Sequence, residues 1–148
     1  MKIDTSELEP GNLPLDVFNS IAFLTVTPVI ELIATTTKGV LLLKRSQNDL
    51  FWPNLFCLPG GIIRSSSESI DTAIEQIVNK NQLIPLSKFN QLDIKLVDTA
   101  RGKELALIYH ITLMGNHKEI CPWNELSQKQ IIKEHLIMIE NYIDSKSK

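Results

Sequence analysis

Stretches of apolar residues, broken by turn-forming residues, predict helices and strands in turn along this chain. The segment from Pro14 to Leu24 fits a short helix with the proline in its first turn. The segment from Val26 to Thr35 is rich in strand-forming residues, and Glu31 is its only charged residue. After a Thr-Thr-Lys-Gly turn, the apolar run from Val40 to Arg45 completes a predicted β-hairpin.

The middle of the chain predicts a loop, a glycine-containing turn and an amphipathic helix. Residues 46–54 contain turn-forming sequences, and the short apolar segment 55–58 leads to Pro59-Gly60-Gly61. From Ser67 to Leu83 the apolar spacing i, i+4, i+7, i+8 predicts a helix that packs Ile70, Ile74, Ile77 and Val78 on a sheet containing residues 40–44. Ser65 and Glu68 have the spacing of a capping box at its start.

The last third predicts two strands and a helix. Leu92 to Thr99 and Glu104 to Met114 fit strands around an Arg101-Gly102 turn. A C-terminal helix is predicted to begin near Ser127, and its inner stripe consists of Ile131, His135, Leu136, Ile139, Tyr142 and Ile143. No repeat or linker divides the chain, so we expect one α+β domain over residues 1–148, with residues 1–13 as a loosely ordered lead.

Composition narrows the choice of partners and location. Fifteen basic and seventeen acidic side chains give a net charge of −2, which provides no electrostatic basis for binding nucleic acid or an anionic membrane. Residues 1–12 lack the apolar run of a signal peptide, and no stretch is long and apolar enough to span a bilayer. A soluble cytoplasmic protein is therefore expected. Cys57 and Cys121 fit no metal-ligand spacing and are predicted to be small buried residues, while His110 and His135 are interpreted as structural.

Residues 40–83 resemble the central part of a Nudix (MutT-like) hydrolase domain. The matching features are the strand VLLLKR, the turn FCLPGG and the strand–loop–helix order. The resemblance implies an α/β/α sandwich with a mixed sheet between helices. It also implies a site where helix glutamates hold Mg²⁺ or Mn²⁺ on a diphosphate. The segment TPVIELIATTTKGVLLLKR is similar in layout to the GDP-mannose hydrolase subgroup.

The Nudix box aligns with this chain from Gly61 without a gap, but its polar positions have changed. Only Gly61, Ile77 and Leu83 match the family pattern. The altered positions are Ser67, Gln76, Asn79 and Lys80 in place of glutamates, Glu75 in place of arginine, and Gln82 in place of glycine. An amide is a poor ligand for a hard cation and an ammonium group is none. The resemblance therefore implies a homologue without standard diphosphatase activity, and no metal or other cofactor is expected.

The leading hypothesis from the sequence is a module that binds a nucleotide or nucleotide sugar. Backbone N–H groups at a glycine-rich turn entering a helix can hold a phosphate, and arginine and aromatic side chains can contact phosphate or base. The candidate ligand-binding residues are Arg45, Phe56, Gly60, Gly61 and Arg64.

Two alternatives remain open. A divergent hydrolase could hold Mg²⁺ or Mn²⁺ with relocated carboxylates, because Glu68, Asp71 and Glu75 are spaced i, i+3, i+7 on a helix. The same three side chains also fit a solvated acidic face. The other alternative is a non-catalytic protein-interaction domain, and a homodimer is compatible with any of these functions.

Overall fold

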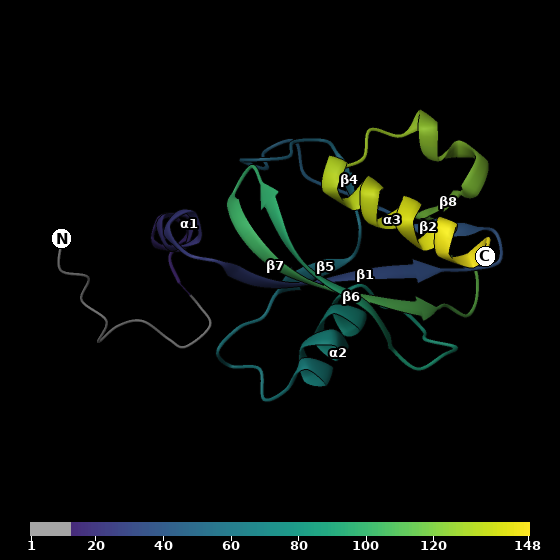
Figure 1. The fold of residues 1–148 in the computed structure, drawn as a ribbon, viewed down its shortest axis with the longest axis horizontal. Coiled ribbons are helices and arrows are strands. Elements are labelled where there is room, and N and C mark those ends of the chain that lie inside the picture. Colours follow the sequence, from purple (N-terminus) through teal and green to yellow (C-terminus); the bar gives the residue numbers. More distant parts are fainter. Residues whose placement is uncertain (1–12) are drawn as a thin grey trace.

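The structure is a computed structural model that describes residues 13–148 (Figure 1). The expected N-terminal lead therefore lies outside the described residues except for Leu13. The helices are α1 (Leu15–Leu24), α2 (Ile70–Lys80), the 3₁₀ helix η1 (Trp123–Gln128) and α3 (Lys133–Lys146). The strands are β1 (Thr27–Thr35), β2 (Gly39–Leu41), β3 (Leu43–Lys44), β4 (Phe56–Cys57), β5 (Gly60–Ile62), β6 (Asn90–Thr99), β7 (Gly102–Thr112) and β8 (Ile120–Pro122).

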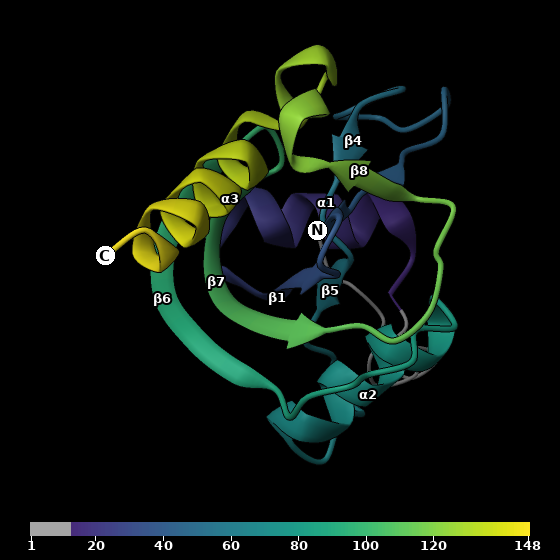
Figure 2. The same cartoon turned by 90° about the vertical axis from the view of Figure 1, so that its right-hand side faces the viewer.

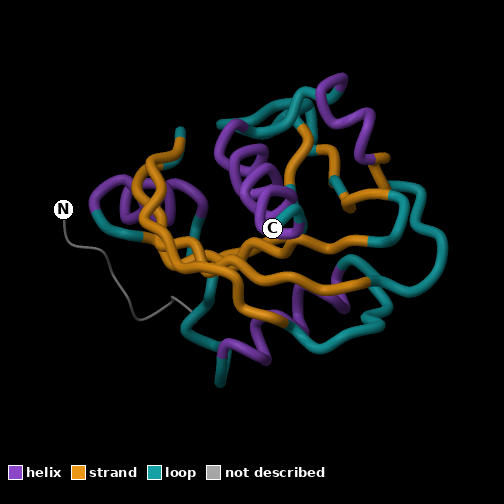
Figure 3. Tube along the Cα trace, turned by 45° about the vertical axis from the view of Figure 1, so that its right-hand side comes forward, coloured by secondary structure: helices purple, strands orange, loops and turns teal. Residues whose placement is uncertain are grey.

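A six-stranded mixed sheet organises the molecule. Its strand order is β6-β7-β1-β2-β8, with β5 paired to β1. β1 runs parallel to β7 and antiparallel to β2 and β5, and β6 and β7 form a long antiparallel hairpin. β3 and β4 form a separate two-stranded sheet, so the single strand predicted over Val40 to Arg45 is divided in two. Figure 3 shows the strands passing between the helices, which confirms the predicted sandwich.

β1 is buried on both faces, so its alternate side chains build two cores. Val29 and Ile33 belong to the core that includes Met138 and Ile139 of α3. Residues of the opposite face, including Ile30 and Leu32, pack in the core that contains Ile74, Ile77 and Val78 of α2. Figures 1 and 2 show α2 and α3 on opposite faces of the sheet. The predicted buried face of the α2 segment is confirmed. No helix within residues 13–148 is long and apolar enough to cross a membrane.

The start of α2 differs from the prediction. The helix begins at Ile70 rather than Ser67, and the capping box of Ser65 and Glu68 is not its cap. Ser69 is the N-cap, and its Oγ accepts a hydrogen bond from the backbone N–H of Thr72 at 3.1 Å. Several serines in this segment can cap a helix, and the one that does so precedes the first apolar residue of the buried face.

The end of α2 is a Schellman motif. The N–H of Gln82 bonds to the carbonyl of Asn79 at 3.1 Å, and the N–H of Leu83 bonds to that of Val78 at 3.0 Å. Gln82 has a φ of 53°, the left-handed conformation that favours glycine. The Nudix box pattern has glycine at the position of Gln82. The helix end therefore keeps the left-handed conformation that suits glycine, although the residue here is glutamine.

Two further predictions are corrected. The glycines of Pro59-Gly60-Gly61, expected to form a turn, belong instead to the strand β5 (Gly60–Ile62). The C-terminal helix begins at Lys133 rather than near Ser127, because residues 130–132 are extended along β4. There Phe56 donates its N–H to the carbonyl of Gln130 at 2.8 Å, and Ile132 donates to the carbonyl of Phe56 at 2.9 Å. The predicted stripe residue Ile131 is therefore outside the helix.

Candidate functional site

A cleft of about 420 Å³ lies on the α3 side of the sheet. We call it the central cleft. It is bounded by β1 and β5, the loop after β3, the β6–β7 hairpin, the start of α3 and the C-terminal end of α2. Its charged and titratable lining residues are Glu31, Lys44, Arg45, Asp49, Cys57, Arg64, Lys80, Arg101, Glu104, Glu134 and His135.

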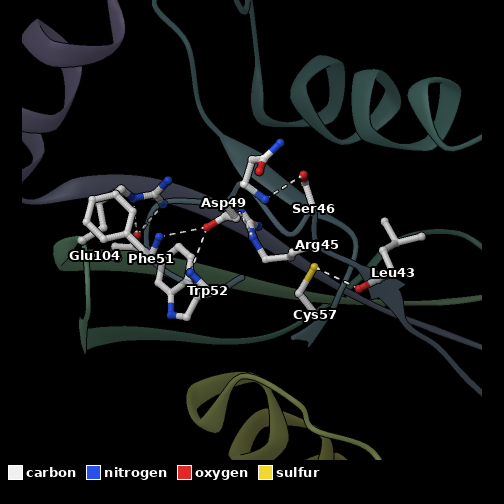
Figure 4. Close-up of polar contacts among 10 residues, drawn as sticks. Leu43, Arg45, Ser46, Asp49, Phe51, Trp52, Cys57 and Glu104 are labelled. Carbon is white, nitrogen blue, oxygen red and sulfur yellow. Dashed lines mark hydrogen bonds and ion pairs between the residues drawn. The ribbon is translucent and has the colours of Figure 1, made fainter. Parts of the chain in front are cut away.

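One wall of the central cleft is fixed by an ion pair in the loop after β3. Arg45 Nε and Nη2 donate to Asp49 Oδ2 at 2.7 and 2.6 Å. Asp49 Oδ1 accepts the backbone N–H groups of Phe51 and Trp52 at 3.1 and 2.9 Å (Figure 4). Burial raises the pKa of Asp49, but these donors outweigh it and hold the pKa below its ordinary value. Asp49 therefore stays ionised and orders the loop.

A stack of alternating rings and guanidinium groups contributes Arg45, Trp52 and Arg101 to the lining of the cleft. The Arg45 guanidinium lies 5.2 Å from the ring centroid of Trp52, and that of Arg101 lies 5.6 Å from the rings of both Trp52 and Phe18. Arg101 is also paired with Glu104 of β7. The stack joins α1, the loop and the β6–β7 turn, and each of its two arginines is already paired with a carboxylate.

Glu31 and His135 meet at the floor of the cleft. Glu31 is only 7% exposed, and its Oε1 lies 3.6 Å from His135 Nε2. The backbone N–H of Leu58 donates to His135 Nδ1 at 2.9 Å, so the imidazole proton is placed on Nε2, facing Glu31.

The protonation of this pair follows from its burial. Burial, reinforced by the nearby Glu104 carboxylate, raises the pKa of Glu31 well above its ordinary value of 4.5. Burial, together with the Arg45 charge, lowers the pKa of His135 to about 4. Glu31 and His135, 3.6 Å apart, would form an ion pair only if the carboxyl were ionised and the imidazole protonated. Burial disfavours the charged form of each group. We therefore describe it as a contact between neutral groups.

The structure brings most of the predicted ligand-binding residues to the cleft. Arg45, Gly60, Gly61 and Arg64 line it. Phe56 does not line it; its ring packs against the core, with the ammonium groups of Lys44 and Lys129 6.0 and 5.6 Å from its centroid. The glycines belong to β5 and precede α2 by several residues, so they are not at a helix entrance.

The altered box residues lie mostly outside the cleft. Of the polar positions, only Lys80 lines it; Ser67 and Gln76 contact each other at 3.4 Å, and Gln82 borders a neighbouring hollow. The carboxylates of the hydrolase alternative, Glu68, Asp71 and Glu75, are exposed and do not line the cleft. Within residues 13–148, no group of three or more His, Cys, Asp or Glu side chains is arranged to hold a metal ion.

The residues interpreted as structural have distinct surroundings. Cys57 and Cys121 are buried free thiols, as predicted. His110 Nε2 lies 2.9 Å from both Thr35 Oγ1 and Tyr142 Oη, outside the cleft. His135 does bond to the backbone, but it also lines the cleft.

Sequence reasoning did not assign Glu31, Asp49, Arg101 or Glu104 to a site. Glu31 alone carried a signal, as the one charge in an apolar strand.

Comparisons with known proteins identify the fold. No protein-family model matches the sequence, and no curated protein matches it. Among solved structures, the NUDIX domain of Shewanella oneidensis NrtR, complexed with ADP ribose, is 19% identical with a TM-score of 0.65, covering 90% of this chain and 99% of that one. A mutT/nudix family protein from Listeria innocua is 20% identical with a TM-score of 0.62, covering 83% and 96% of the two chains.

A third similar structure belongs to a larger protein. The bifunctional NMN adenylyltransferase/ADP ribose pyrophosphatase from Francisella tularensis, complexed with AMP and a Mn ion, is 11% identical with a TM-score of 0.61. The match covers 87% of this chain and 46% of that one. The agreement extends over nearly the whole described chain in proteins of low sequence identity. This chain therefore has the Nudix fold.

Proposed function

We propose that this chain binds a nucleotide or nucleotide sugar in the central cleft and lacks the metal-dependent diphosphatase activity of Nudix hydrolases. The observation that carries the proposal is the charge that α2 presents there. Lys80 lines the cleft, whereas the helix carboxylates Asp71 and Glu75 do not. The helix therefore brings a group that attracts phosphate and none that would hold a divalent cation.

The box residues do not fit a metal. Asn79 and Lys80 offer an amide and an ammonium group where the resemblance expects two carboxylates, and Ser67 Oγ donates a hydrogen bond to Gln76 Oε1. Mg²⁺ requires anionic oxygen ligands in near-octahedral geometry. We therefore derive no catalytic step through a metal at this helix.

Cationic groups at the edge of the cleft can bind phosphate directly. Arg64 and Lys80 are exposed and line the cleft, and Lys80 has no ion-pair partner among the described residues. Arg45 and Arg101 are paired with Asp49 and Glu104. Phosphate groups are expected at the exposed edge.

The similar structures guide the choice of probes. The Shewanella NUDIX domain was solved with ADP ribose, which makes ADP-ribose the first ligand to test. NrtR has also been solved with a 27mer DNA, in a match that covers 58% of that longer chain. Our expectation that this chain does not bind nucleic acid stays a prediction, as do the homodimer and the cytoplasmic location.

Calorimetric titration tests the proposal. ADP-ribose and GDP-mannose are titrated into the protein in EDTA, then product release is measured in Mg²⁺ or Mn²⁺. We expect saturable metal-independent binding of at least one ligand and, at most, trace hydrolysis. Lys80→Gln should weaken binding about tenfold, because it removes a charged hydrogen-bond donor. The control Lys88→Gln, an exposed lysine outside the cleft, should leave binding unchanged.

Other results would favour the alternatives. Robust turnover that Glu68→Gln, Asp71→Asn or Glu75→Gln abolishes would favour the hydrolase with relocated carboxylates. Neither binding nor turnover would favour the protein-interaction domain.

A further inference from the structure

The floor of the central cleft contains a buried carboxyl oxygen without a partner. Glu31 Oε2 is the one buried side-chain nitrogen or oxygen among the described residues that lacks a hydrogen bond. Leaving such a group unpaired is costly, and folded proteins usually satisfy it with protein, water or ligand atoms. Because Glu31 lines the cleft, a bound ligand can supply the missing partner.

The surroundings hold this carboxyl in one orientation. The Leu58 N–H donates to His135 Nδ1, which leaves the imidazole proton on Nε2, and Nε2 lies 3.6 Å from Glu31 Oε1. Oε2 is the oxygen that remains. A Cβ atom at Gly60 would collide with Oε2, so the absence of a side chain at Gly60 makes room for this oxygen. The FCLPGG turn thus contributes both a backbone donor that orients His135 and a glycine that makes room for Glu31.

The charges around Glu31 favour its protonated form. Both nearby arginines already have carboxylate partners, Asp49 and Glu104. Burial and the Glu104 charge raise the pKa of Glu31, and the arginines offset this only in part. The titratable and charged groups that face it from other elements are Arg45, Cys57, Arg101, Glu104 and His135. With His135 Nε2–H directed at Oε1, the proton of a neutral Glu31 belongs on Oε2.

We propose that Glu31 is a ligand-recognition residue, which donates a hydrogen bond from Oε2 to an uncharged oxygen of the bound nucleotide, such as a sugar hydroxyl or a base carbonyl. This inference rests on the proposed function and specifies its geometry. The phosphates lie at the exposed edge with Lys80, because Arg45 and Arg101 are already paired with carboxylates. The uncharged part of the ligand then reaches the floor, where a neutral acid provides a donor without repelling an anionic ligand.

The test compares wild type with Glu31→Gln and Glu31→Ala. A ¹³C NMR titration of the Glu31 carboxyl first gives its pKa, and ADP-ribose binding in EDTA is then measured at one pH below it and one above. Glutamine keeps a donor of nearly the same shape, so Glu31→Gln should match wild type at the lower pH and vary less with pH. Wild-type affinity should fall as the carboxyl ionises. Glu31→Ala should bind about 3–10 times more weakly at the lower pH, as expected for one lost hydrogen bond.

Two controls make the outcomes distinct. Glu140→Gln changes an exposed α3 carboxylate outside the cleft and should change nothing, and circular dichroism checks that each variant is folded. Pyrophosphate, which lacks a sugar and a base, should bind wild type and Glu31→Ala equally. If ADP-ribose binds but Glu31→Ala binds it as tightly as wild type, the inference fails alone. If ADP-ribose and GDP-mannose both fail to bind wild type, the proposed function fails with it.

Discussion

The adjacent glycines of β5 allow the packing at the cleft floor to be tested with one added methyl group. At Gly60, a Cβ atom would lie 2.6 Å from the backbone oxygen of Ile30 and even closer to Glu31 Oε2. At Gly61 the nearest atom is Cγ1 of Ile77 at 3.6 Å, an ordinary contact. Neither glycine has a positive φ, so alanine suits both backbones and only the local space differs.

The expected cost follows from these contacts. Ile30 lies in β1, which is paired to β7 and β5, so its carbonyl cannot move away without disturbing the sheet. Inserting a methyl group into such a packed site costs about 1–3 kcal/mol. Replacing glycine by alanine returns about 0.4–1 kcal/mol by restricting the unfolded chain. We expect Gly60→Ala to lose about 1–2 kcal/mol of stability and Gly61→Ala to be neutral or slightly stabilised.

Urea unfolding followed by circular dichroism measures the difference between the two variants. For a chain of this length, about 2 kcal/mol corresponds to roughly 4–8 °C in Tm. The ¹³C shift of the Glu31 carboxyl should also change in Gly60→Ala and stay close to wild type in Gly61→Ala. Equal stability of the two variants would refute the placement of Glu31 against Gly60.

Three further predictions concern α2 and the buried pair, all measured by unfolding. Ile74→Ala should cost about 2–5 kcal/mol because Ile74 is fully buried between α2 and the sheet, while the half-buried Ile70→Ala should cost clearly less. Gln82→Gly should stabilise the protein by up to about 1 kcal/mol by relieving the left-handed conformation, whereas Gln82→Ala should not. Acidification from about pH 6.5 to about pH 4 protonates His135 in the unfolded chain but not in the folded protein, so its contribution to stability falls by at most about 3 kcal/mol. Glu31 has the opposite effect, because its raised pKa makes its contribution to stability fall as the pH rises above about 4.5. Glu31→Gln lacks this contribution, so its free energy of unfolding should fall more steeply on acidification than that of wild type. Equal slopes for wild type and variant would contradict the raised pKa.

Much of the fold follows from apolar periodicity. The stripe of Ile70, Ile74 and Ile77 identified α2 and its buried face, because a helix that packs on a sheet must repeat near 3.6 residues. The division of Val40 to Arg45 into two strands was not predictable, because it depends on pairing with β4 and β8. The late start of α3 has the same origin, since β4 holds residues 130–132 extended.

The site was less predictable than the fold. Its polar residues come from segments far apart in sequence. The pairing of β1 with β7 brings Glu31 near Glu104, and the packing of α3 on the sheet brings His135 to Glu31. A single charge inside an apolar strand was nevertheless a local signal, because an unpaired buried carboxyl needs a compensating environment. His135 was interpreted from its place on an apolar helix face, and that pattern cannot show which polar group it meets.

The altered box residues and the charges that line the cleft both support direct binding of phosphate without a metal ion. In the family pattern, several glutamates on one helix would repel a diphosphate, so a metal must lie between them. Here Lys80 reaches the cleft from that helix, and a phosphate can bind it directly. Lys80→Glu should therefore abolish ADP-ribose binding in EDTA, because the new carboxylate repels the phosphates that Lys80 attracts. Calorimetry in EDTA measures this, and unchanged binding of Lys80→Glu would show that the phosphates lie elsewhere.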